Sequence, residues 1–526
     1  MTAAPMKSVP MKSVLLLAPL AARTVPELLD RACVFGLDRP FFHDLGSDVR
    51  LSYGTFLEHV SGAAHALAER FPAGATIATL LSNRAECVIL RFALSCAGLC
   101  EAAINGQHRG AVLKEMLRAA GPVAIVCESG FRDGAQSCLL SFDDIAWIDE
   151  GELARLCALR RPWAERPARA VKPADACRIV YTSGSSGVSK GAELSHGYEV
   201  YTGFAYATRV GLRPDDRWYY VTPFFHIDSV LSLAATLHGG GGFVLAPRFS
   251  ASRYWADAVR CGATVIVYVG TILSILKKQG DPPPGHGVRV ATGVGGTPAL
   301  REFFEDRHNI PMLEIYGLSE CAAASIDDSR ARRAGSCGKP LEGYEVAVLD
   351  TEGRALPAGK RGEIAIRPRE PFALFSGYRG NPESTLKAFA NLWFHTGDLG
   401  SYDADGYLYF HGRMKDVIRH RDENISAEEL EAIADTYPAV LMSAAVGVPG
   451  DLDDENVLLY VQARPGAAID PAELCAFLAE RCVPFMVPDH ITIVEAFPMT
   501  ATEKIAKSQL PRTLDAGAWT RPTPRR

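Results

Sequence analysis

Apolar runs alternate with helical patterns over most of the chain. Residues 53–70 carry apolar side chains at helical spacing, and short apolar runs at residues 76–81 and 123–127 lie between such patterns. The alternation resumes at residues 265–269, which precede another helical pattern. Regular alternation of strands and helices is typical of parallel βα units. The pattern therefore predicts an α/β fold with a large N-terminal domain of doubly wound sheets.

The pattern changes after residue 335. Residues 335–411 contain short strand-like runs separated by Asp-Gly and Glu-Gly turns, which indicates a β-barrel-like subdomain. Further on, a helical pattern at residues 427–436 and an apolar strand at residues 444–448 predict a small, mobile α+β domain. We therefore expect an N-terminal domain at 1–411, a hinge at 412–416 and a C-terminal domain at 417–526.

Composition narrows the function classes. The chain has 526 residues, of which 48% are hydrophobic and 22% charged, as in ordinary globular proteins. Its net charge of −6 gives no general attraction to nucleic acid or anionic lipid, and no apolar run approaches the ~18 residues of a membrane span. Thirteen cysteines without a CxxC pair suggest neither a disulfide framework nor a zinc ribbon. We expect a cytoplasmic protein, either a monomer or a homodimer.

A stretch rich in Gly and Ser follows the apolar residues 179–181 directly. Its hydroxyls can donate to phosphate oxygens, its glycines permit close backbone approach, and Lys190 adds a positive charge. The spacing is not that of a Walker A motif, so the fold need not be that of a P-loop NTPase. A flexible linker is the alternative, but linkers do not usually follow a buried strand and end in Lys-Gly. The candidate phosphate ligands are Thr182, Ser183, Gly184, Ser185, Ser186, Gly187 and Lys190.

This stretch resembles the phosphate loop of the adenylate-forming superfamily, which includes acyl-CoA and aryl-CoA ligases, nonribosomal peptide adenylation domains and firefly-type luciferases. Further motifs follow in the order of that family: PFFH from Pro223, YGLSE from Tyr316, HTGD from His395, GRMKD from Gly412 and TATEK from Thr500. Together the six motifs cover residues 25–510. The chain looks most like the carnitine and crotonobetaine CoA ligase branch.

The resemblance implies a site for ATP and Mg²⁺. Adenine would stack on Tyr316, opposite a run of small residues, and Asp398 would accept hydrogen bonds from the ribose. Glu320 and Thr182 would hold Mg²⁺, which carboxylates bind together with substrate phosphates. The implied nucleotide-binding residues beyond the phosphate loop are Gly295, Gly296, Thr297, Tyr316, Gly317, Ser319, Asp398, Arg413 and Lys504.

The resemblance also implies how the chemistry is divided. Lys504 would stabilise the charge that develops when a carboxylate attacks the α-phosphate of ATP. Lys190, Glu320 and His226 would assist catalysis from the larger domain. Lys415 lies where the family has its hinge, so rotation of the C-terminal domain would exchange Lys504 for residues 412–426 in the second step.

The acid would bind in a pocket that includes the PFFH motif. His226 would either shape this pocket or transfer a proton. Asp228 is an unusual charge beside such a wall, and one hypothesis is that it pairs with a cationic or amino group of the acid. The implied pocket residues are Phe224, Phe225, His226, Asp228, Tyr268 and Cys321.

Two residues depart from the pattern of the family, and one of them leaves the acceptor of the activated group open. Ser189 replaces a proline, which is a mild change, but Asp422 replaces a glycine where CoA-using relatives bring the backbone close to the pantetheine. The leading prediction is an ATP-dependent acyl- or aryl-CoA ligase with CoA as cosubstrate. The alternatives are an adenylating enzyme that uses a carrier protein, an amine or nitrite, as in an ATP-dependent diazotase, and an inactive nucleotide-binding relative.

Overall fold

The structure is a computed structural model. It describes residues 22–139, 145–182, 190–328, 331–414, 417–420, 423–450, 455–500, 505–515 and 517–522. The chain forms two compact units, one of Met1–Val346 with Ile366–Phe394 and one of Ala347–Ala365 with His395–Arg526. The expected domain boundary at residues 412–416 stays a prediction, because residues 415 and 416 lie outside the described part.

In the described part of the larger unit, the first two α-helices begin at residues whose side chains cap them. Helix α2 (Val25–Ala32) starts at a capping box, in which the Thr24 hydroxyl accepts from the backbone of Glu27 and the Glu27 carboxylate accepts from the backbone of Thr24. Helix α3 (Tyr53–Arg70) follows the predicted helical spacing and starts at Ser52, which accepts from the backbone N–H of Thr55.

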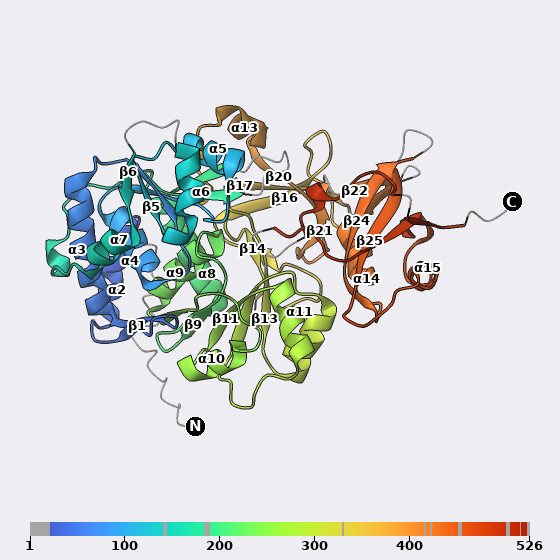
Figure 1. The fold of residues 1–526 in the computed structure, drawn as a ribbon, viewed down its shortest axis with the longest axis horizontal. Helices are drawn as coiled ribbons and strands as arrows, with labels where there is room; N and C mark the ends of the chain where they lie inside the picture. Colours follow the sequence, from blue (N-terminus) through green and yellow to red (C-terminus); the bar gives the residue numbers. More distant parts are fainter. Residues whose placement is uncertain are drawn as a thin grey trace, which may run out of the picture. The chain divides into compact units, whose positions relative to one another are not determined.

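A seven-stranded sheet forms one layer of the larger unit, in the order β18-β8-β7-β4-β3-β5-β6. Its central strands β3, β4, β5 and β7 are parallel, whereas β8 and β18 join antiparallel. Helices α3, α4 and α7 pack together beside this sheet (Figure 1). The strands are β3 (Thr76–Leu80), β4 (Cys100–Ala103), β5 (Ala124–Cys127), β6 (Ala146–Ile148), β7 (Ala176–Thr182), β8 (Lys190–Ser195) and β18 (Gly377–Tyr378), and the helices are α4 (Ala85–Cys96) and α7 (Glu150–Ala158).

A nine-stranded sheet forms the second layer, in the order β15-β14-β13-β12-β11-β9-β10-β1-β2. The neighbouring strands β13, β12, β11, β9, β10 and β1 are parallel. At the two ends of the sheet, β14, β15 and β2 pair antiparallel with their neighbours. Helices α8 (His196–Val210) and α9 (Ile227–Gly239) pack against each other. The strands are β1 (Pro40–Asp44), β2 (Arg50–Ser52), β9 (Arg217–Tyr220), β10 (Gly242–Leu245), β11 (Val265–Val269), β12 (Val290–Val294), β13 (Met312–Tyr316), β14 (Ser325–Ile326) and β15 (Lys339–Pro340).

The β-rich segment predicted at residues 335–411 contains most of a five-stranded sheet. Its order is β16-β17-β20-β19, and β21 also pairs with β20. The strands are β16 (Tyr344–Leu349), β17 (Gly362–Pro368), β19 (Phe389–Ala390), β20 (Trp393–Tyr402) and β21 (Leu408–Arg413).

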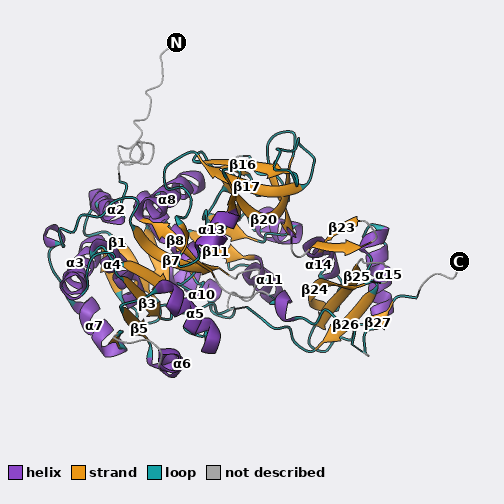
Figure 2. Cartoon of the chain, turned by 90° about the horizontal axis from the view of Figure 1, so that it is seen from above, coloured by secondary structure: helices purple, strands orange, loops and turns teal. Residues whose placement is uncertain are grey.

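The C-terminal part of the smaller unit is an α+β layer. A four-stranded sheet in the order β24-β25-β26-β27 shares an apolar core with helices α14 and α15, as Figure 2 illustrates. These elements are β24 (Val440–Pro449), β25 (Glu455–Ala463), β26 (His490–Val494), β27 (Trp519–Thr520), α14 (Ala427–Ala434) and α15 (Pro471–Ala479), with a hairpin of β22 (Val417–His420) and β23 (Glu423–Ser426). The predicted α/β class with a small α+β part is therefore confirmed. Among the described residues, no helix is both long and apolar enough to cross a membrane.

Candidate active site

The two ends of the predicted phosphate loop meet in a hairpin. Thr182 ends β7 and Lys190 begins β8, and the two residues are paired in the antiparallel register. The Thr182 hydroxyl lies 3.4 Å from the carbonyl oxygen of Lys190. Ser183, Gly184, Ser185, Ser186 and Gly187 lie outside the described residues. The return as a strand rather than a helix distinguishes this loop from a P-loop.

Tyr378 connects the basic and acidic residues predicted for this site. Its hydroxyl donates to Oε1 of Glu320 at 2.6 Å, and Lys190 Nζ lies 5.0 Å from the centroid of its ring. The sequence patterns did not indicate this tyrosine, because it lies in none of the six motifs. Only the pairing of β18 with β8, which sets Tyr378 opposite Ala192, brings it to the loop.

Backbone contacts from three elements hold the turn that carries Glu320. The carbonyl of Ser319 accepts from the Tyr198 hydroxyl at 2.8 Å, and that of Cys321 accepts from the Tyr344 hydroxyl at 2.9 Å. Between them, the carbonyl of Glu320 itself accepts from the backbone N–H of Phe375 at 2.8 Å. Three consecutive carbonyls are thus fixed by three separate parts of the chain, so the backbone that carries the Glu320 side chain is well defined.

Gly317 and Ala322 make this turn tight. Ala322 has φ of +49°, which is the left-handed region that few residues other than glycine adopt. A Cβ on Gly317 would collide with the carbonyl oxygen of Ala322. The turn therefore needs glycine at position 317, and the contact of Gly317 with the nucleotide stays a prediction.

The small-residue run predicted to face adenine rests on a buried carboxylate. Glu314 accepts from the backbone N–H groups of Gly295 at 2.5 Å and Gly296 at 2.9 Å, and from the Tyr268 hydroxyl at 2.7 Å. Burial raises the pKa of Glu314 above its usual value, although these hydrogen bonds oppose the shift. Thr297 then begins helix α12 (Pro298–Arg301) by accepting from the Leu300 backbone. Glu314 was missed because its role depends on the register of β12 and β13.

Two of the predicted site residues are buried tyrosines. Tyr316, at the end of β13, is 5% exposed, and Tyr268 is 1% exposed in the core between its sheet and helices. Tyr268 donates to Glu314, which accepts from the backbone of Gly295 and Gly296, so Tyr268 supports this run. Its place in the acid pocket stays a prediction. A stacking role for Tyr316 stays a prediction.

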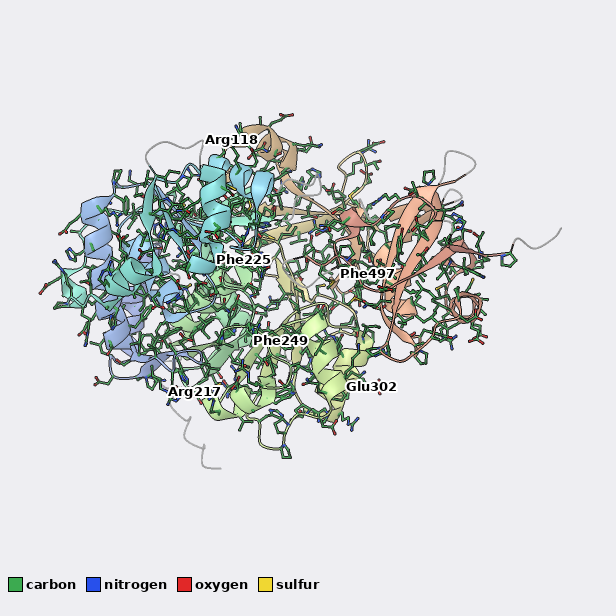
Figure 3. All side chains as sticks on the ribbon, viewed as in Figure 1. Arg118, Arg217, Phe225, Phe249, Glu302 and Phe497 are labelled. Atoms are coloured by element: carbon green, nitrogen blue, oxygen red, sulfur yellow. The ribbon has the colours of Figure 1, made fainter. Side chains whose placement is uncertain are left out.

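Two polar side chains, the half-buried Asn83 and the buried Arg91, hold the backbone of the PFFH segment. The backbone N–H of Phe224 donates to Asn83 at 2.8 Å, and Arg91 donates to the carbonyl oxygen of Phe224 at 2.9 Å. The Arg91 guanidinium also lies 3.9 Å from the centroid of the Phe224 ring. Phe224 is buried, whereas Phe225, labelled in Figure 3, and His226 are half-buried with ring centroids 4.4 Å apart.

Asp228 already has a partner within the chain. It lies in the first turn of α9 and accepts from the Thr222 hydroxyl at 2.5 Å. Cys321 is completely buried. The hypothesis that Asp228 faces a cationic group of the acid stays a prediction.

Arg91 belongs to a buried network of four charges. Arg91 and Arg178 both lie 3.0 Å from Oε2 of Glu101, and Arg178 also lies 3.1 Å from Glu199. Burying charged groups costs free energy unless they are paired and hydrogen-bonded. The network joins α4, β4, α8 and the strand β7 that leads to Thr182. It therefore ties the PFFH segment to the strand that carries the phosphate loop.

In the smaller unit, Asp398 and Arg413 form an ion pair. Arg413 Nε lies 2.9 Å from Oδ1 of Asp398, which is 2% exposed. The backbone N–H of Asp398 donates to the Thr396 hydroxyl at 3.1 Å, and that of Gly397 donates to Glu363 at 3.0 Å. The HTGD motif is thus a rigid strand segment with a buried carboxylate.

The predicted catalytic lysine and the hinge lysine are not placed. Lys504, Lys415 and Asp422 lie outside the described residues. The ends of the segment that carries Lys504 are described: Met499 and Ile505 form an antiparallel bridge. Two residues further, Lys507 Nζ lies 2.7 Å from Glu431 on α14.

The carboxylate of Glu320 suits Mg²⁺ better than a soft metal ion. Among the described residues there is no group of three or more His, Cys, Asp or Glu side chains that could enclose a metal ion. Glu320 is a single buried carboxylate oriented by a hydroxyl. Mg²⁺ is usually held by one or two carboxylates together with substrate phosphates and water, so this residue fits such a site.

Comparison with known proteins identifies the family. The model of the AMP-binding enzyme family matches residues 29–379, and that of the AMP-binding enzyme C-terminal domain matches residues 429–504. Sulfoacetate–CoA ligase of Cupriavidus necator is 29% identical over 93% of this chain and 99% of that protein. Medium/long-chain-fatty-acid–CoA ligase FadD17 of Mycobacterium marinum is 30% identical over 93% and 95%. Crotonobetaine/carnitine–CoA ligase of Citrobacter koseri is 32% identical over 64% and 66%.

Solved structures agree in fold. The anthranilate CoA ligase AuaEII in complex with anthranoyl-AMP has a TM-score of 0.85 at 22% identity, covering 94% of this chain and 98% of that one. ATP-bound MatB from Rhodopseudomonas palustris has a TM-score of 0.82 at 24% identity, covering 91% and 97%. The predicted resemblance to AMP-forming CoA ligases is therefore confirmed, and this chain belongs to the AMP-binding enzyme family.

Proposed function

We propose that this protein is an ATP- and Mg²⁺-dependent ligase that activates a carboxylic acid as an acyl-adenylate and transfers the acyl group to CoA. The observation that carries the proposal is the arrangement of Lys190 and Glu320 around Tyr378, where Lys190 begins the strand that follows the Gly/Ser loop. An ammonium and a carboxylate beside such a loop suit a magnesium-bound polyphosphate. Membership of the AMP-binding enzyme family supports the same assignment.

The family resemblance suggests a role for each described residue of the site. Lys190 and Thr182 would bind phosphate oxygens, and Glu320 would hold Mg²⁺. When bound, Mg²⁺ neutralises charge on the phosphates and orients them. Gly295, Gly296 and Thr297, which border β12 and α12, would line the adenine position, and in the smaller unit Asp398 and Arg413 would contact the ribose or phosphates.

The chemistry proceeds in two steps. A carboxylate oxygen of the acid forms a bond to the α-phosphorus of ATP, and the bond from that phosphorus to the departing oxygen breaks, so pyrophosphate leaves. The thiol sulfur of CoA then attacks the carbonyl carbon and loses its proton, and AMP departs with the bonding electrons of the broken C–O bond. Lys504 would stabilise the charge at the α-phosphate in the first step.

The relatives are named for chemically different acids, so a panel of acids is needed to identify the substrate of this chain. The relatives are ligases of sulfoacetate, of medium- and long-chain fatty acids and of crotonobetaine or carnitine. Phe225 and His226 are half-buried at the proposed pocket, and Asp228 is the charge nearest to them in sequence. The panel should therefore include short anionic, long apolar and cationic acids.

A pyrophosphate-release screen tests the proposal. The purified protein is assayed with ATP and Mg²⁺ over the acid panel, over aromatic amines with nitrite, and in buffer alone, each with and without CoA. The expected result is acid-dependent pyrophosphate release together with a CoA thioester detected by mass spectrometry. Release of pyrophosphate without a thioester would indicate an acceptor other than CoA, such as a carrier protein. Asp422, which replaces a glycine of the CoA-using relatives, is the reason to test this alternative. No release with any substrate would favour an inactive nucleotide-binding relative.

A further inference from the structure

Tyr378 lies where it can control both charged groups of the proposed phosphate site. Its hydroxyl contacts Glu320 and its ring faces Lys190, at the distances given above. An ammonium and a carboxylate that neutralised each other would weaken both the phosphate site and the metal site. Tyr378 offers each of them a partner without formal charge, through the electron-rich face of the ring and the proton of the hydroxyl.

The position of the Tyr378 side chain is set by several independent contacts. Its backbone N–H donates to the Thr385 hydroxyl at 2.9 Å, and its ring packs against Phe375 with centroids 4.9 Å apart. On the following residue, the backbone N–H of Arg379 donates to the carbonyl of Gly191, and the side chain pairs with Glu193 at 2.6 Å. These contacts anchor β18 to β8, one residue from Lys190, so the hydroxyl reaches Glu320 from a rigid support.

We propose that Tyr378 is a positioning residue for Mg²⁺ and phosphate binding: its hydroxyl orients the Glu320 carboxylate toward the metal, and its ring holds the Lys190 ammonium. The proposal rests on the proposed function, because it assigns Glu320 to Mg²⁺ and Lys190 to phosphate. A carboxylate that binds a metal is commonly oriented by a hydrogen bond from a neighbouring group, and loss of such a partner typically costs about 10- to 100-fold in metal affinity.

The test measures binding rather than turnover. The affinity of the purified full-length protein for ATP is determined by titration calorimetry at a series of Mg²⁺ concentrations. In Tyr378→Phe the ring remains and the hydroxyl is lost. We expect the Mg²⁺ concentration that gives half of the gain in ATP affinity to rise about 10-fold or more. ATP affinity without Mg²⁺ should stay within about twofold, because Lys190 keeps its ring partner.

Further variants separate the two parts of the side chain. Tyr378→Leu removes ring and hydroxyl, so ATP affinity should fall without Mg²⁺ as well. In a Glu320→Gln background, Tyr378→Phe should add less than about twofold, because the carboxylate it orients is gone. Tyr53→Phe is the matched control: it removes a hydroxyl that donates to the carbonyl of Gly241 at 2.7 Å elsewhere in the same unit.

The outcomes distinguish this inference from the proposed function. If the wild-type protein binds ATP in a Mg²⁺-dependent way and Tyr378→Phe has the same Mg²⁺ midpoint, the positioning role is wrong and the proposed function stands. If the wild-type protein shows no Mg²⁺-dependent binding of ATP, the proposed function is wrong and the inference with it. Equal losses in Tyr378→Phe with and without Mg²⁺ would indicate a general disturbance of the fold and would also overturn the positioning role.

Discussion

Arg413 and Asp398 face each other across β20 and β21, and Arg413 Nε lies 2.9 Å from Oδ1 of Asp398. The carboxylate is buried, whereas the guanidinium side chain is 43% exposed. Because the exposed partner can move at less cost than the buried one, Asp398 is the fixed member of the pair. A ligand that needs a carboxylate acceptor would find one already oriented here.

Replacement of Asp398 by Asn is expected to weaken ATP binding about 10- to 100-fold, since hydrogen bonds to a charged group contribute about 1.5–3 kcal/mol. Asn keeps the shape but loses the charge and the ion pair with Arg413. Titration calorimetry with ATP measures the change. Arg361→Gln, which removes an exposed ion pair with Glu429 in the same unit, is the control. A similar loss of affinity in both variants would contradict a specific role for Asp398.

Breaking the buried network at Arg91 should destabilise the larger unit strongly. Arg91→Met leaves Glu101 with one of its two guanidinium partners and removes the donor to the Phe224 carbonyl. Removing one partner of a buried ion pair typically costs about 3–5 kcal/mol. Urea unfolding measures the change in the free energy of unfolding.

The matched comparison for Arg91 is a surface pair. Arg118→Met removes an exposed ion pair with Glu115 and should cost less than about 1 kcal/mol. The double variant Arg91→Met with Glu101→Leu should lose less stability than Arg91→Met alone plus Glu101→Leu alone, because each single change removes a partner of a charge that stays buried, whereas the double variant removes both charges. Strict additivity would show that the two groups do not act as a pair.

Glu431 makes the stability of the smaller unit depend on pH. Burial raises the pKa of this carboxyl to about 7, while Lys507 and the backbone N–H of Ala445 oppose the shift. The folded state therefore binds more protons than the unfolded state between about pH 4.5 and 7. The stabilisation from this group is fully present below that window and is lost as the pH rises through 7.

Glu431→Gln should remove this slope. Between pH 5 and 8, the wild-type protein should lose up to about 3 kcal/mol relative to the Gln variant. Hydrogen exchange of the β24 and β25 amides, corrected for the intrinsic effect of pH, reports the local free energy of opening. Parallel pH profiles for the two proteins would show that Glu431 does not titrate in this range.

Lys504→Ala should separate the two half-reactions. We expect pyrophosphate release to fall by about 100-fold or more, the usual cost of removing a group that stabilises transition-state charge. Thioester formation from a supplied acyl-adenylate and CoA should remain near the wild-type rate. Lys360→Ala, at an exposed position of the same unit, is the control. Equal loss in both half-reactions would contradict the assigned role of Lys504.

Sequence patterns alone determined the fold class and the family. Helix α3 occupies the predicted residues 53–70, and β11 occupies the predicted residues 265–269, because local apolar spacing decides which face of a segment can be buried. The motifs around Lys190, Glu320 and Asp398 indicated adenylate chemistry before any contact was known. These features depend on residues close together in the chain.

The residues that support the site became identifiable only from the tertiary structure. Tyr378 reaches Glu320 and Lys190 through strand pairing across more than 180 residues, and Glu314 reaches Gly295 and Gly296 from a neighbouring strand. Single-sequence patterns record which side chains are available and how they alternate. They do not record which distant groups become neighbours once burial forces each polar atom to find a partner.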